Sequence, residues 1–73
     1  MGEVQAGKIM LLKRVRGDWP FGHHLIAEPG IYVPFLNRFG AVSVEINGEL
    51  LGLKPSEFQW FDKPDPEVYE RQS

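Results

Sequence analysis

The residues best suited to chemistry in this chain are two adjacent histidines, His23 and His24. Imidazole rings bind zinc and exchange protons near neutral pH. Neighbouring side chains of an extended strand point to opposite faces, however, so the pair is a poor chelate. A structural zinc site takes four ligands, and the chain has two histidines and no cysteine. We therefore expect no metal and no cofactor, with one histidine packed and the other solvated.

The nucleophilic and acidic residues also give little support for a catalytic site. The three serines, Ser43, Ser56 and Ser73, have no histidine near them in the sequence, and no Gly-x-Ser-x-Gly motif is present. Glu45 and Glu49 flank a predicted hairpin whose surface should be open to solvent. A chain of 73 residues also has little volume for a pocket that buries a substrate. We therefore expect that the protein is not an enzyme.

Four cations form the second candidate site. They lie along one predicted strand and its end: Lys8, Lys13, Arg14 and Arg16. On a regular strand Lys8, Arg14 and Arg16 share one face. Trp19 or Phe21, which follow closely, could stack a base, as in small barrels that bind single-stranded nucleic acid. The alternative is an ordinary solvated strand end, and the acidic balance of the whole chain favours it.

The aromatic residues of one loop form the third candidate. Trp19 and Phe21 flank a proline between two glycines. Exposed aromatic residues on rigid loops often anchor protein–protein interfaces. The alternative, equally weighted, is that one of them covers an open end of a small core. The residues predicted to contact a protein partner are Trp19, Phe21, Tyr32, Pro55 and Trp60.

Length and composition limit the protein to one small domain. It has 73 residues, 42% of them hydrophobic, and no cysteine, so packing must stabilise the fold, either alone or together with oligomerisation. The formal charge is −2, but residues 1–40 carry five basic and three acidic groups, whereas residues 41–73 carry three and seven. No apolar run approaches the ~20 residues of a membrane span. The N-terminus does not resemble a signal peptide, so we expect a cytoplasmic protein.

Residues 41–53 give the clearest structural signal. Hydrophobic residues alternate with polar ones up to Asn47-Gly48, the dipeptide most typical of a two-residue hairpin turn. The predicted cross-strand pairs are Ile46 with Glu49, Val44 with Leu51, and Val42 with Leu53. Because cross-strand partners share a face, we expect one apolar patch on the inner side of the hairpin. Its predicted members are Val42, Val44, Leu51 and Leu53.

Shorter elements surround this hairpin. Residues 8–15 are a strand candidate, although neither of its faces is cleanly apolar. Residues 31–36 are typical of a strand, and Pro34 places them at a sheet edge or a bulge. Turns are predicted over residues 28–30 and 37–40. One helical turn is predicted over residues 54–57, a closing strand over 58–61 and a solvated tail from residue 62.

The segment from Leu51 to Phe58, LGLKPSEF, resembles the end of an SH3-type barrel. In that family a strand ends in Gly-Leu, a 3₁₀ turn begins with Pro-Ser, an aromatic residue follows, and the last strand closes the barrel. Gly52-Leu53, Pro55-Ser56 and Phe58 stand at these positions, with Phe58 where a tyrosine is usual. The resemblance implies that Pro55 and Phe58 correspond to residues that line a groove for proline-rich peptides.

These observations predict an all-β fold with a five-stranded SH3-like barrel over residues 8–61 and a single 3₁₀ turn before the last strand. Residues 1–7 should be a frayed N-terminus, and residues 62–73 a flexible, disordered acidic tail. We expect a small non-catalytic module that binds another protein in a regulatory or inhibitory role. The alternatives are a nucleic-acid-binding barrel associated with transcription or translation and a homo-oligomer with paired strand edges. No membrane partner is expected.

Overall fold

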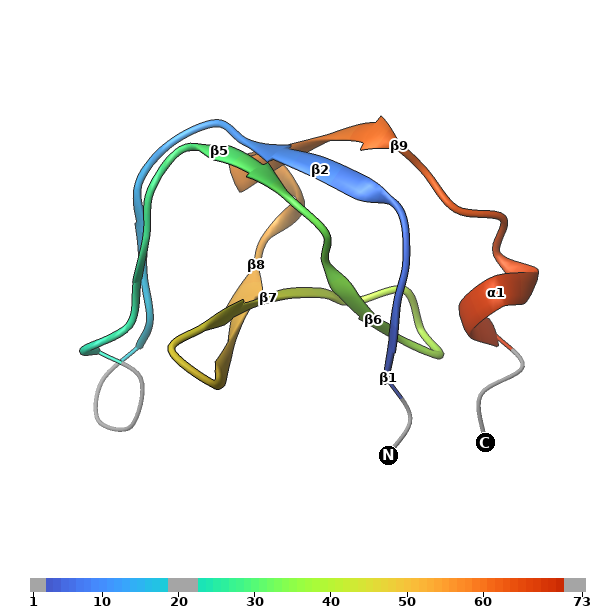
Figure 1. The fold of residues 1–73 in the computed structure, drawn as a ribbon, viewed down its shortest axis with the longest axis horizontal. Helices are drawn as coiled ribbons and strands as arrows, with labels where there is room; N and C mark the ends of the chain where they lie inside the picture. Colours follow the sequence, from blue (N-terminus) through green and yellow to red (C-terminus); the bar gives the residue numbers. More distant parts are fainter. Residues whose placement is uncertain (1–2, 19–22, 71–73) are drawn as a thin grey trace.

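The computed structural model describes residues 3–18 and 23–70. Short antiparallel strands dominate this part of the chain, so the predicted all-β class is confirmed (Figure 1). The elements are β1 (Glu3–Gln5), β2 (Lys8–Leu11), β3 (Val15–Arg16), β4 (Ile26–Ala27), β5 (Gly30–Tyr32), β6 (Phe35–Asn37), β7 (Val42–Ile46), β8 (Glu49–Leu53), the 3₁₀ turn η1 (Pro55–Glu57), β9 (Phe58–Asp62) and α1 (Glu67–Glu70).

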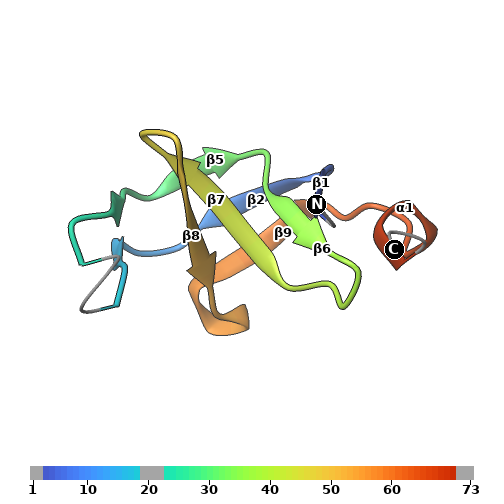
Figure 2. The same cartoon turned by 90° about the horizontal axis from the view of Figure 1, so that it is seen from below.

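The strands form three antiparallel sheets rather than one closed barrel of five strands. Within the described ranges the strand orders are β1-β6-β7-β8, β5-β2-β9 and β3-β4. Two bent segments join the larger sheets, because the chain passes from β1 to β2 around Gly7 and from β5 to β6 around the buried Pro34. Seen from below, β7 and β8 cross β2 and β9 at a steep angle, so the two larger sheets pack as layers (Figure 2).

The β7–β8 hairpin has the register that the sequence predicts. Val42 pairs with Leu53, Val44 with Leu51 and Ile46 with Glu49. Asn47 and Gly48 have φ values of 54° and 85°, the positive angles that this tight turn requires. The inward side chains pack into the core, whereas Glu45 and Leu50 point outward and are exposed.

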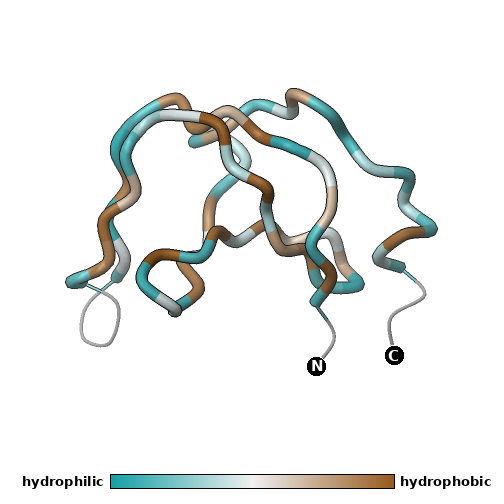
Figure 3. The backbone as a smooth tube through the Cα atoms, in the orientation of Figure 1, coloured by the Kyte–Doolittle hydropathy of each residue, from teal (hydrophilic) through white to brown (hydrophobic). Residues whose placement is uncertain are grey.

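The core lies between the layers, and its described members are apolar side chains and one tyrosine. Figure 3 shows that hydrophobic residues occur along both layers and also in α1. The buried residues are Ile9, Leu11, Val15, Leu25, Ala27, Leu36, Val42, Val44, Leu51 and Tyr69. Burying this set supplies most of the stabilisation available to so small a domain.

Residues 8–16 do not form one regular strand. The chain bends at Lys13, which separates β2 from β3, and β3 then pairs with β4. Ile9, Leu11 and Val15 point inward, which settles the face that the sequence left open. After the bend, β3 and β4 form a short arm (Figure 1), and Val15 on this arm belongs to the core.

Both ends of the described chain are more ordered than the sequence predicts. Residues assigned to a frayed N-terminus form β1, which pairs with β6. Beyond β9, in the segment predicted to be a disordered tail, α1 packs against β1 and β6 and places Tyr69 in the core. Because that segment is mostly polar and charged, the sequence did not indicate that Tyr69 belongs to the core.

Candidate binding surface

Tyr32 and Trp60 lie on the inner side of the β5–β2–β9 sheet. They are the cross-strand neighbours of Ile9, one on each side, and both pack half-buried against the core. The Trp60 ring meets Phe58 edge to face, with 5.9 Å between ring centroids. Two of the predicted partner-contacting residues therefore support the core, and their exposed area is limited.

Pro55 is exposed at the start of η1. The turn is held by the Lys54 N–H, which donates to Glu57 Oε1 over 2.8 Å. Phe58 follows directly and is half-buried, so Pro55 and Phe58 lie within one short segment. Trp19 and Phe21, the other two predicted contact residues, lie outside the described residues.

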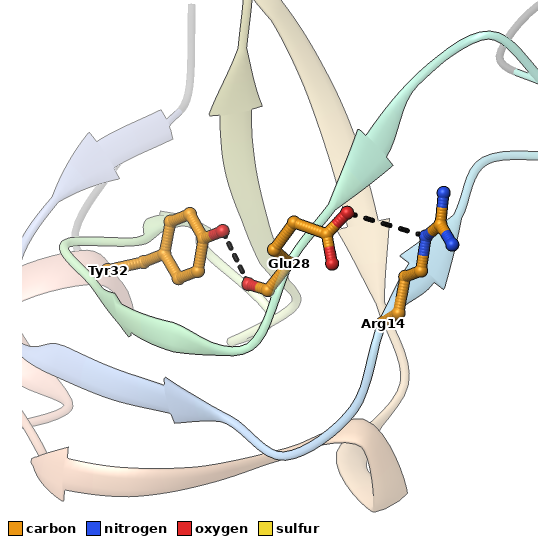
Figure 4. A network of polar contacts seen from close by, with 3 residues as sticks. All are labelled: Arg14, Glu28 and Tyr32. Atoms are coloured by element: carbon orange, nitrogen blue, oxygen red, sulfur yellow. Dashed lines mark hydrogen bonds and ion pairs between the residues drawn. The ribbon is translucent and has the colours of Figure 1, made fainter.

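The four predicted cations are all exposed, but two have acidic neighbours. Arg14 Nε lies 3.4 Å from Glu28 Oε2, and the Glu28 backbone oxygen accepts a 2.6 Å hydrogen bond from the Tyr32 hydroxyl (Figure 4). Lys8 stands opposite Asp62 in the β2–β9 register. The bend at Lys13 also prevents the regular strand that would align Lys8, Arg14 and Arg16 on one flat face.

Both histidines are exposed, so the expected division into one packed and one solvated ring is not seen. Their rings lie edge to face with centroids 6.0 Å apart. His24 Nε2 is 3.1 Å from Glu49 Oε2 at the tip of the β7–β8 hairpin. No cluster of three or more histidine, aspartate or glutamate side chains that could hold a metal ion occurs among the described residues.

The structure reveals an apolar surface that the sequence analysis did not assign. We call it the outer sheet face: the outward hydrophobic side chains of the β5–β2–β9 sheet and of the residues that directly follow β2 and β5. Its members are Met10, Leu12, Ile31 and Val33, and all four are exposed. Met10 occupies the centre, with Ile31 opposite it in β5 and Gln59 opposite it in β9.

A bulge interrupts β9 beside this face. Ile9 pairs with Trp60 and Lys8 with Asp62, so Phe61 is the extra residue of β9. A bulge re-aims the side chain of its extra residue and bends the strand. The Phe61 side chain is 65% exposed, and Asp62 rather than Phe61 occupies the position opposite the outward Lys8. The sequence did contain a signal for this apolar surface, because both faces of residues 8–15 contain large apolar side chains.

A second exposed aromatic residue, Phe39, lies away from the outer sheet face in the turn between β6 and β7. It is 80% exposed, and the Arg38 guanidinium lies 5.0 Å from its ring centroid. The turn is rigid because Asn37 Oδ1 accepts hydrogen bonds from the N–H groups of Phe39 and Ala41. The prediction of a turn over residues 37–40 is thus confirmed.

Over the described residues, fold and surface together define a small all-β protein. Its two larger antiparallel sheets pack in layers, and an apolar face is turned to solvent. No family model matches the chain, and neither a curated protein nor a solved structure matches it. Among the described residues, no helix has the length and apolar character needed to cross a membrane.

Proposed function

We propose that this protein is a non-catalytic module that binds another protein through its outer sheet face. The observation that carries the proposal is the exposure of four large hydrophobic side chains on one side of one sheet. An antiparallel sheet with one face on the core normally turns polar residues toward water. Contiguous apolar patches on small soluble domains mark interaction sites. The occupant is therefore an apolar protein surface.

The charges around this face also favour a neutral partner. Arg14 is paired with Glu28, and Lys8 stands opposite Asp62. A nucleic acid or an anionic membrane surface would be favoured by uncompensated cations. Balanced charges leave apolar burial as the main source of affinity, at roughly 25 cal/mol per Å² of area removed from water.

For the architecture we infer an SH3-like barrel in which two of the five strands are bent. The bent segments β1–β2 and β5–β6, with β7, β8 and β9, supply five strands, and β2 pairs with β9 across the sequence. Support comes from η1, which starts at Pro55 between β8 and β9, and from the Asn47-Gly48 hairpin. In this arrangement the outer sheet face lies on the opposite side of the sheet from Phe58, so the proposed surface differs from a peptide groove at Pro55 and Phe58.

Site-specific crosslinking tests the proposed function. A photoreactive phenylalanine analogue at Ile31, which is exposed, is expected to form adducts with discrete protein surfaces in cell extract. The substitution Met10→Lys should reduce adduct yield at least about tenfold, because it puts a charge at the centre of an apolar contact. Mass spectrometry of the adducts provides the measurement, and circular dichroism confirms that the variant folds.

Phe39→Ala is the matched control, because it removes an exposed aromatic residue outside the outer sheet face. It should leave the adducts formed from position 31 unchanged. If Met10→Lys and Phe39→Ala have the same effect, the adducts arise from non-specific collision and the proposal fails. Adducts with lipid or RNA instead of protein would also overturn it.

A second candidate function, binding of single-stranded nucleic acid, rests on the exposure of all four cations near β2 and β3. We expect only weak binding that is lost between about 20 mM and about 150 mM salt, because Arg14 is paired with Glu28 and Lys8 stands opposite Asp62. Fluorescence titration with single-stranded DNA and RNA measures it, with a Lys13→Ala, Arg16→Ala double variant as control. Binding that stays tight at the higher salt concentration and falls in the double variant would favour this second candidate over the first.

A further inference from the structure

We infer that the occupant of the outer sheet face is a second copy of this chain, packed face to face in an antiparallel, two-fold symmetric dimer. The inference rests on the proposed function, whose binding surface it shares. It follows from three properties of that surface: its balanced charge, its size, and the position of its one lysine.

The balanced charge makes a second copy a compatible partner. The face has an apolar centre at Met10 and Ile31. Its outward polar members are Lys8, Gln59 and Asp62, which is the residue opposite Lys8. Two copies therefore bring together largely neutral surfaces, and the acidic neighbours of Lys8 and Arg14 limit repulsion between them. A chain near the lower size limit for a stable core also gains from burying further apolar area by association.

The position of Lys8 selects one arrangement. A two-fold axis that runs along β2 would stack Lys8 of one copy on Lys8 of the other. An axis that lies in the contact plane and crosses β2 at Met10 makes the two β2 strands antiparallel instead. Lys8 and Leu12 lie two residues on either side of Met10, so Lys8 of each copy then lies over Leu12 of the other. The two ammonium groups are separated by about 14 Å, four residues of strand, and the lysine stems cover apolar surface.

The size of the face limits the affinity. Three strands at a spacing of about 4.8 Å and five residues at about 3.4 Å each give a face of roughly 14 by 17 Å. With its protruding side chains, such a face buries on the order of 1,000 Å² over both copies, near the lower limit for specific interfaces. We therefore expect a dissociation constant on the order of 100 µM.

Sedimentation equilibrium of the full chain tests the dimer. Between about 10 µM and about 1 mM, a range that brackets this constant, the average mass should rise from 8.3 kDa toward twice that value. Met10→Lys should remain monomeric throughout, whereas Phe39→Ala should associate like the wild type. A wild-type chain that stays monomeric at the highest concentration overturns the inference. The proposed function would then be judged by the crosslinking from Ile31 alone, because a different protein in those adducts supports it without the dimer.

A matched pair of substitutions at Leu12 tests the arrangement. Both remove the same exposed apolar side chain, but Leu12→Glu places a carboxylate under Lys8 of the other copy, whereas Leu12→Lys places an ammonium group there. Leu12→Glu should dimerise within about threefold of the wild type, and Leu12→Lys should weaken the dimer at least about tenfold, because each contact occurs twice. Equal effects of the two substitutions would overturn the antiparallel arrangement.

Discussion

Replacing Gly7 by alanine is expected to destabilise the fold by more than about 3 kcal/mol, a large fraction of what a domain of this size has. Gly7 has a φ of 76°, where an L-residue with a side chain is strained. A Cβ atom there would lie 2.6 Å from the Asp62 backbone oxygen and 2.7 Å from Pro64 Cδ. The bend that joins β1 to β2 is therefore packed directly against the end of β9, and backbone must move to admit one methyl group.

Gly48→Ala is the matched control for this prediction. Gly48 has a similar φ of 85°, but a Cβ atom there would meet nothing within 4 Å. Its expected cost is about 1 kcal/mol, the backbone strain alone. Urea unfolding of the two variants measures the difference, which isolates the steric part. Equal losses of stability would show that the chain does not pack against Gly7 as described.

Replacing Tyr69 by serine is expected to cost about 2–3 kcal/mol, because a buried aromatic side chain is removed from the core. Tyr69 is the one buried residue of α1. Its ring lies against Gly40, since Tyr69 Cε1 is 3.3 Å from the place of a Cβ atom on that glycine. The loss should appear in the global free energy of unfolding, measured with urea, and in faster hydrogen exchange of β1 and β6, which α1 contacts.

Val68→Ser is the control for Tyr69, because Val68 is the adjacent residue of α1 and is exposed. Its effect should stay within about 0.5 kcal/mol. If residues 62–73 were the disordered tail expected from the sequence, neither substitution would change the stability. A neutral Tyr69→Ser variant would show that α1 is not docked.

The hairpin of β7 and β8 was predictable because its information is local. The Asn47-Gly48 turn fixes the register, and the alternation on either side independently selects the inward face. The helical turn at Pro55 was predictable for a similar reason, since proline suits the first position of such a turn. In both segments the residues that determine the structure lie within a few positions of one another.

The strands that depend on distant partners were less predictable. β1 is a strand because it pairs with β6, and the prolines and charges after Asp62 suggested disorder until Tyr69 was seen to reach Gly40. Propensity does not report such contacts, because tertiary packing overrides it. The predicted closed barrel of five strands is not confirmed, because the chain bends at Gly7 and Pro34 and the strands form separate sheets.

The candidate surface was not predicted from the sequence, because the predicted contact residues were mainly aromatic. Tyr32 and Trp60, which were predicted to contact a partner, lie on the inner side of the sheet and pack half-buried against the core. Met10 and Ile31 were not among the predicted contact residues, and the sequence left open which face of residues 8–15 points outward. Only the register of β2 with β5 shows that these two side chains share the outward face.

The pairing of β2 with β9 joins Lys8 to Asp62, so the sheet that carries the proposed surface unites the early and late parts of the chain. During translation β2 has no β9 partner until the residues through Asp62 have emerged from the ribosome. Such long-range pairing also slows folding relative to local contacts. A nascent or truncated chain lacking β9 would therefore not assemble this surface, and recruitment through it would report that synthesis has passed that point.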